Sequence, residues 1–166
     1  MIRRIEPDAD RDCFIEAHLW TVSSPTWFKQ AERVFGPQTL NDFIAGSKEE
    51  NRVTFGLFEG ELIGVIIFTL RFRGVYEVDF LAKPRCDAEA IVRNCLALRD
   101  RLFNDLGAIE LFCWLAQKNF PTRRLLCILG FSDSGLRLLR GTYRDRVIEW
   151  QRLSLPRKVW EGLKAA

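Results

Sequence analysis

Two carboxylates, Glu77 and Asp79, are the side chains best placed in the sequence for acid–base chemistry. They lie two residues apart in 75–82, a segment whose pattern is typical of a β-strand, so both face the same side of a sheet. A carboxylate in this position could take a proton from an amine, directly or through water. The structural alternative is that they pair with neighbouring arginines such as Arg71 or Arg73 across the sheet.

The second candidate site is the junction 84–90, between this strand and the helical pattern that follows it. In open α/β sheets, ligands bind outside the carboxyl ends of strands, where the N–H groups of a helix N-terminus can receive a phosphate. Asp87 is the natural N-cap of this helix, and its carboxylate would take N–H groups that a phosphate needs. Asp87 and Glu89 also place negative charge there, which Arg85 and Lys83 offset only in part.

Two stretches of sequence resemble motifs of a known family. The junction reads Arg85-x-x-Ala88-x-Ala90, and a later stretch has three residues at a recognisable spacing, Asn119, Gly130 and Phe131. The chain here resembles the GCN5-related N-acetyltransferases (GNAT). Their pyrophosphate loop reads Arg/Gln-x-x-Gly-x-Gly/Ala, and their second stretch typically reads Asn-x-x-Ala-x-x-x-Tyr-x-x-x-Gly-Phe. The order of elements is similar along nearly the whole chain, and the layout is also similar to that of short phage-encoded GNAT-like proteins.

The resemblance implies an acyl-CoA-dependent N-acyltransferase that transfers an acetyl group to an amine in a ternary complex. Acetyl-CoA would lie across the start of the long helix, with Glu77 or Asp79 as the base. The acceptor, a small-molecule or protein amine, would enter between the region 20–28, which contains Trp20 and Trp27, and the strand 75–82. The residues expected to bind the cofactor are Phe80, Leu81, Ala82, Arg85, Cys86, Asp87, Ala88, Glu89, Ala90 and Asn119.

Two positions depart from the family pattern. Ala88 stands where the family has glycine, and its Cβ narrows the approach of the backbone to a phosphate. Leu126 stands where the family often has the tyrosine that protonates the departing thiolate, and leucine cannot donate a proton. The alternative function is therefore a non-catalytic binding or structural protein of the same fold, phage-encoded and virion-associated or host-directed, with a protein as its partner.

The elements that position these residues follow from hydrophobic periodicity. Helices are expected after Asp8 or Asp10, with Cys13, Phe14, Ala17 and Leu19 facing inward, and over 27–35, 39–45, 87–106 and 121–129. Strands are expected over 2–5, 52–58, 62–72, 75–82, 108–115, 136–139 and 146–153. Together with the resemblance, this order predicts an α/β (α+β), GNAT-like fold. Its central mixed sheet is mostly antiparallel, with one parallel β–α–β pairing and helices on both faces. One domain would span 1–155, and 156–166 would be a frayed basic helical tail.

Composition restricts the remaining properties. A length of 166 residues with 48% hydrophobic and 28% charged residues fits a single globular domain. The longest apolar stretch, 62–70, is too short for a membrane helix, and the N-terminus turns acidic before a signal-peptide core can form. Five cysteines without CxxC pairs and a single histidine show no zinc spacing, which favours free thiols in the cytoplasm.

The charge pattern and the edges of the expected sheet bear on partners. A net charge of +3 is too small a basic bias to favour nucleic-acid binding. The densest basic cluster, which is read as a solvated strand face, is Arg137, Arg140, Arg144 and Arg146. An exposed edge strand near 146–153 would allow a homodimer to form by sheet extension.

Overall fold

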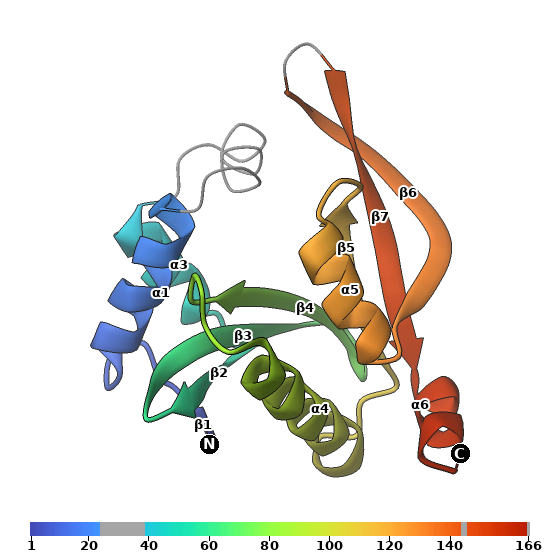
Figure 1. Ribbon diagram of the computed structural model, residues 1–166, viewed down its shortest axis with the longest axis horizontal. Helices are drawn as coiled ribbons and strands as arrows, with labels where there is room; N and C mark the ends of the chain where they lie inside the picture. Colours follow the sequence, from blue (N-terminus) through green and yellow to red (C-terminus); the bar gives the residue numbers. More distant parts are fainter. Residues whose placement is uncertain (24–38, 144–145, 166) are drawn as a thin grey trace.

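The computed structural model describes residues 1–23, 39–143 and 146–165 (Figure 1). The strands are β1 (Ile2–Arg4), β2 (Arg52–Glu59), β3 (Glu61–Phe72), β4 (Val75–Ala82), β5 (Glu110–Ala116), β6 (Ser132–Tyr143) and β7 (Arg146–Pro156). The helices are α1 (Arg11–Ser23), α3 (Leu40–Ser47), α4 (Ala88–Asp105), α5 (Phe120–Ile128) and α6 (Arg157–Ala165). The expected α/β fold is confirmed; the helix expected over 27–35 lies outside the described residues.

The strands form one mixed sheet in the order β1-β2-β3-β4-β5-β7-β6, and every neighbouring pair is antiparallel except β4 and β5. The expected meander of β2, β3 and β4 is confirmed, and its first hairpin turns at Gly60, whose φ of 74° favours glycine. The parallel pairing across α4 is also confirmed.

The parallel pairing between β4 and β5 is short. It joins three residue pairs, Val75↔Glu110, Tyr76↔Leu111 and Glu77↔Phe112. Beyond these pairs β5 keeps its register with β7 as far as Ala116, while β4 keeps its register with β3 as far as Ala82. The two strands therefore part after Glu77 and Phe112. The sheet opens there into two arms, one made of β1–β4 and the other of β5–β7 (Figure 1).

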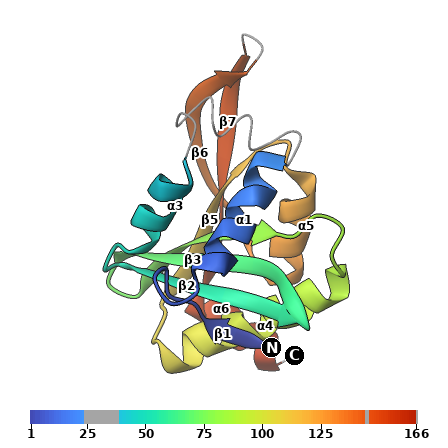
Figure 2. The same ribbon diagram turned by 90° about the vertical axis from the view of Figure 1, so that its left-hand side faces the viewer.

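Helices cover both faces of the sheet, and a separate core lies under each face. The larger core packs α4, α5 and the Trp160 side chain of α6 against one face. The smaller core packs α1 and α3 against the other. Figure 2 shows α1 and α3 above the strands β2 and β3, with α4 below them. Side chains of β4 therefore alternate between two environments: Val78 and Phe80 face the larger core, whereas Leu81 faces the smaller one.

Helix α1 buries a different residue from the one expected. Phe14 and Ala17 are fully buried as expected, but Leu19 is 56% exposed and Trp20 is buried in its place. Positions two apart on an α-helix are separated by about 200° around its axis, so Leu19 cannot share the inward face with Ala17. Trp20, three residues after Ala17, lies close to that face.

The C-terminal segment is a packed helix, so the expectation of a frayed tail is wrong. Trp160 of α6 is 4% exposed and stacks on Phe103 of α4 with ring centroids 4.7 Å apart. Its indole N–H donates a hydrogen bond of 2.7 Å to the Asp100 carboxylate. Arg157 also donates to the Ala108 carbonyl at 2.8 Å. Helix α6 thus extends the core that lies under α4.

The strand expected to form an exposed edge is an interior strand. β7 lies between β5 and β6, so the edges of the sheet are β1 and β6, and the expectation of an edge near 146–153 is wrong. β6 is longer than the expected 136–139 because its pairing with β7 continues through two irregularities, one of which contains Gly135. A glycine in a sequence is usually taken as the end of a strand, but at a β-bulge the strand continues through it.

Within the described part of the chain, no helix is long and apolar enough to cross a membrane.

Candidate functional site

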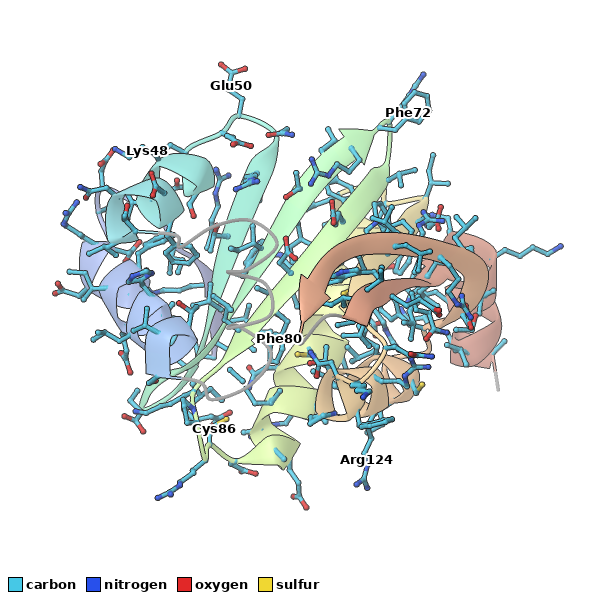
Figure 3. The ribbon with its side chains drawn as sticks, turned by 90° about the horizontal axis from the view of Figure 1, so that it is seen from above. Lys48, Glu50, Phe72, Phe80, Cys86 and Arg124 are labelled. Carbon is cyan, nitrogen blue, oxygen red and sulfur yellow. The ribbon has the colours of Figure 1, made fainter. Side chains whose placement is uncertain are left out.

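The open end of the split between β4 and β5 is a cleft of about 1330 Å³. Its floor is the end of β4, residues Phe80, Leu81 and Ala82. The loop 83–86 and the first turns of α4 form one wall, and the start of α5 forms another. Trp20 and Ser23 of α1 line it from the opposite face of the sheet. Figure 3 shows Phe80 deep between these walls, with Cys86 and Arg124 at the rim.

The end of β4 offers its main chain to this cleft. The Lys83 N–H donates to the Ile63 carbonyl of β3 at 2.9 Å, whereas the Gly74 carbonyl accepts from the Glu110 N–H on the β5 side at 3.2 Å. Because successive peptide groups of a strand point to opposite edges, even-numbered residues of β4 direct their N–H and C=O toward β5. Beyond Glu77 no described strand pairs with that edge, so Phe80 and Ala82 present main-chain groups to the gap.

Four basic side chains line the cleft, and two of them are already paired. Lys83 lies 2.5 Å from Glu61, and Arg93 lies 2.9 Å from Glu59. Arg85, in the loop before α4, and Arg124, on α5, have no ion pair with any residue that the structure describes. These two guanidinium groups are therefore the positive charges in the cleft that remain available for an anion.

The start of α4 is capped by its own side chain, as expected. Asp87 is the N-cap, and its carboxylate accepts a hydrogen bond of 2.9 Å from the Glu89 N–H. Ala90, 1% exposed, packs into the larger core rather than lining the cleft. Ala88 and Glu89 do line the cleft. A phosphate at this helix end would need free N–H groups. It would meet instead the Glu89 N–H already bonded to Asp87, the Cβ of Ala88 and the carboxylate of Glu89.

The loop leading to α4 holds a residue in the left-handed region. Arg85 has a φ of 63°, and the Cys86 N–H donates to the Lys83 carbonyl at 3.3 Å. This is a type II-like turn with Pro84 at its second position and Arg85 at its third, the position that favours glycine. A non-glycine residue in this region carries a strain of about 1 kcal/mol or more. In spite of that strain, the turn places Arg85, a cationic residue, in the wall of the cleft.

Glu77 and Asp79 share the face of β4 opposite to Val78 and Phe80, on the side of α1 and α3. Glu77 lies 2.5 Å from the Arg71 guanidinium, which is the structural pairing foreseen as the alternative. Asp79 has neither a hydrogen bond nor an ion pair with the residues described. Asp79 is exposed at its surface, and desolvation, and after it the charge of Glu77, raises the pKa of Asp79 to about 6.

Asn119 serves as a helix cap. It is 7% exposed, and its side-chain oxygen accepts a hydrogen bond of 3.3 Å from the Thr122 N–H at the start of α5. It is not among the residues that line the cleft. Leu126, about two turns after Asn119 on α5, is buried and faces the larger core. Trp20 lines the cleft, whereas Trp27 lies outside the described residues.

Sequence reasoning missed the contribution of α5 to the cleft. Thr122, Arg124 and Leu125 line it, and although they lie within the motif stretch 119–131, none was among the residues expected to bind the cofactor. The signal available was position: α5 follows β5, so its first turns lie at the same end of the sheet as the start of α4. Ser23, at the end of α1, gave no comparable signal.

Comparison with known proteins finds similarity in structure without similarity in sequence. No protein-family model and no curated protein sequence matches the chain. Among solved structures, spermidine N-acetyltransferase SpeG from Vibrio cholerae in complex with CoA and spermine superposes with a TM-score of 0.73, at 14% identity over 97% of each chain. A point mutant of the same enzyme gives 0.73 at 12% identity over 99% of each chain.

A third structure is yncA from Salmonella typhimurium, described as a putative acetyltransferase with its cofactor acetyl-CoA. It gives a TM-score of 0.70 at 16% identity, covering 94% of this chain and 92% of its own. At such identities the likeness establishes the fold, which is the GNAT fold. It does not by itself assign an activity.

Proposed function

We propose that this protein is an N-acyltransferase that takes an acyl group from an acyl-CoA and transfers it to an amine. One observation carries the proposal: β4 and β5 part after Glu77, and the uncovered main chain of Phe80 and Ala82 lies along the floor of the cleft. An extended ligand rich in amide groups, such as the pantetheine arm of coenzyme A, could pair with that edge as a further strand does. Neighbours of the same fold have CoA or acetyl-CoA bound.

The residues of the cleft fit the pantetheine part of the coenzyme better than its pyrophosphate. The main-chain edge of β4 and the apolar side chains of α4 and α5 suit the pantetheine. The capped start of α4 does not suit a pyrophosphate, because Asp87 takes the Glu89 N–H and Glu89 adds negative charge. We therefore assign the phosphates to Arg85 and Arg124, whose guanidinium groups bind phosphate oxygens in a bidentate manner.

Bound acyl-CoA would supply an activated acyl group as a thioester at the bottom of the split. The amine nitrogen attacks the thioester carbonyl carbon, the C–N bond forms, the C–S bond breaks, and the electron pair leaves with the thiolate. Asp79 faces the side of α1, so an amine that enters from that side would meet its carboxylate first. With a pKa near 6, Asp79 is ionised at neutral pH and takes the proton that the amine loses. The thiolate then takes a proton from water.

Glu77 is the weaker candidate for the base because its carboxylate is held by Arg71. In this proposal Glu77 positions Arg71, and its negative charge helps to raise the pKa of Asp79. The acceptor would be a small-molecule amine, the class to which the spermine bound by the similar SpeG enzyme belongs.

The test is a calorimetric titration of acetyl-CoA into the protein, followed by mass spectrometry of a panel of amines incubated with both. We expect a Kd of about 100 μM or tighter, and a ligand concentration of 100 Kd should add about 2.7 kcal/mol to the free energy of unfolding. Absence of any thermal shift at millimolar acetyl-CoA would rule the proposal out.

The burial of Leu126 favours a second candidate, a non-catalytic protein of the same fold that binds a protein partner. Leu126 lies in the core at the position where the family often has its proton-donating tyrosine. The non-catalytic candidate is supported if acetyl-CoA binds but no amine in the panel is acylated, and if the Asp79→Asn variant also binds acetyl-CoA without acylation. Turnover that is lost in Asp79→Asn excludes it.

A further inference from the structure

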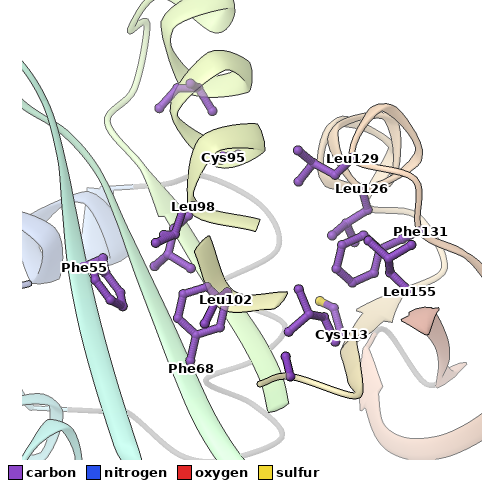
Figure 4. Close-up of a cluster of buried hydrophobic side chains, with 14 of the residues drawn as sticks. Phe55, Phe68, Cys95, Leu98, Leu102, Cys113, Leu126, Leu129, Phe131 and Leu155 are labelled. Atoms are coloured by element: carbon purple, nitrogen blue, oxygen red, sulfur yellow. The ribbon is translucent and has the colours of Figure 1, made fainter. Parts of the chain in front are cut away.

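A second, smaller cavity of about 40 Å³ lies beneath the cleft, between the sheet and the helices α4 and α5. Its walls include Cys95 and Leu98 from α4, Leu126 from α5, Val78 from β4 and Cys113 from β5. Figure 4 shows Cys95 and Leu98 on α4 and Leu126 and Leu129 on α5, with Cys113 below the α5 residues in this view. We refer to this cavity as the apical hollow.

The apical hollow continues the cleft toward the point where the strands part. Phe80, Thr122 and Leu125 line both the cleft and the hollow. Val78 and Cys113 are each one residue beyond the last parallel pair, Glu77↔Phe112. The hollow therefore lies at the apex of the split, one step deeper than the Phe80 floor along which an extended ligand would run.

The walls of the hollow are apolar, which determines what can occupy it. The charged group at its border, Arg99, is already engaged, since it donates to the Leu129 carbonyl at 2.8 Å and pairs with Asp100 at 2.8 Å. Burial raises the pKa of the Cys95 thiol to about 12 and that of the Cys113 thiol further, so both thiols stay neutral. Water would find few hydrogen-bond partners there, whereas an alkyl group would gain van der Waals contacts.

We propose that the apical hollow receives the alkyl chain of the acyl group, so that the protein prefers short-chain acyl-CoA thioesters longer than acetyl-CoA. This inference rests on the proposed function. A cavity needs about 10–15 Å³ on this measure to hold one water-sized group, so 40 Å³ holds about three. Three carbon atoms beyond the carbonyl carbon correspond to a butyryl group.

Calorimetric titration of the whole protein with CoA, acetyl-CoA, butyryl-CoA and octanoyl-CoA tests the inference. Each buried methylene should tighten binding about fourfold, so butyryl-CoA should bind about 15-fold more tightly than acetyl-CoA. Octanoyl-CoA, whose chain exceeds the hollow, should bind more weakly than butyryl-CoA. Affinities for acetyl-CoA and butyryl-CoA within twofold of each other would overturn the inference while leaving the proposed function intact. Absence of binding by all four compounds would overturn both.

Two variants locate the effect in the hollow. Cys95→Leu adds volume to the wall, so the preference for butyryl-CoA should fall below threefold while the Kd of acetyl-CoA changes less than twofold. Leu126→Ala enlarges the hollow and should move the optimum to hexanoyl-CoA. The matched control, Ile44→Ala, truncates a buried side chain of α3 on the opposite face and should leave the series unchanged. Circular dichroism confirms folding, and an unchanged preference in both folded hollow variants contradicts the inference.

Discussion

The carboxylate of Asp87 accepts the Glu89 N–H at 2.9 Å, so the side chain that begins α4 occupies a main-chain donor at the rim of the cleft. A helix N-terminus has few such donors, and each one used by a cap is lost to a ligand. The protein thus stabilises this helix at the expense of its capacity to bind an anion.

Replacing the cap should separate these two effects. Asp87→Gly frees the Glu89 N–H and removes a negative charge, so acetyl-CoA should bind more tightly, and the free energy of unfolding should fall by only a few tenths of a kcal/mol. Asp87→Ala should also bind more tightly but lose about 1 kcal/mol of stability. Calorimetry and urea denaturation measure the two quantities. Weaker binding in the glycine variant would contradict this account of the loop.

The strained turn at Arg85 allows a matched pair of substitutions. Arg85→Gly and Arg85→Ala both remove the guanidinium group, but only glycine adopts a φ of 63° without strain. The glycine variant should therefore be more stable than the alanine variant by about 1 kcal/mol in urea denaturation. Both should bind acetyl-CoA more weakly than the wild type. Equal stability of the two variants would show that the turn relaxes once the arginine is gone.

Asp79 should contribute a distinct pH dependence to stability. Because its pKa is raised in the folded state from 3.8 to about 6, the native protein binds a proton more tightly than the unfolded chain. Its contribution to the free energy of unfolding therefore falls as pH rises from about 4 to 6 and is constant above. Asp79→Asn should gain stability relative to the wild type when urea denaturation is moved from pH 4.5 to pH 7.5. A relative loss over that interval would contradict the raised pKa.

Arg124 should contribute to the affinity for acetyl-CoA through its charge. Arg124→Ala should raise the Kd, and the loss should shrink as salt increases because the contact is electrostatic. The control, Arg101→Ala, removes an arginine of α4 that pairs with Asp105 and does not line the cleft. Calorimetry at 50 mM and 500 mM NaCl compares them. Equal effects of the two substitutions would indicate a general charge effect.

The stacked pair of Phe103 and Trp160 should make α6 essential to stability. Trp160→Ala should lower the free energy of unfolding by about 3–5 kcal/mol, since it removes a buried aromatic side chain and leaves a cavity. Lys158→Ala, at an exposed position of the same helix, should change it by less than about 0.5 kcal/mol. Urea denaturation measures both, and a small effect at Trp160 would restore the idea of a dispensable tail.

Local chemistry explains what could be predicted from the sequence. The meander of β2–β4, the Gly60 turn, the length of α4 and the Asp87 cap all depend on residues close together in the chain. Several residues of the junction 84–90 line the cleft, because the end of a parallel strand and the start of the next helix meet at one edge of the sheet. That the junction binds a ligand stays a prediction.

Tertiary contacts explain what could not be predicted. In the sequence, Trp160 is part of a basic segment with no sign of burial. It is buried because it stacks on Phe103 and donates a hydrogen bond to Asp100, which are distant in the chain. The availability of Arg124 depends on which acidic side chains reach the cleft, and the raised pKa of Asp79 depends first on desolvation in the folded protein. None of these follows from spacing along the chain.

The early parting of β4 and β5 makes one wall of the cleft independent of side-chain identity. The gap between the arms is a property of strand register, and the groups that face it at Phe80 and Ala82 are peptide groups that every residue except proline can supply in full. A main-chain edge of this kind depends on the topology and register of the strands and not on their side chains. Ala88 and Leu126 can therefore differ from the motif pattern without any change to the peptide groups that face the gap.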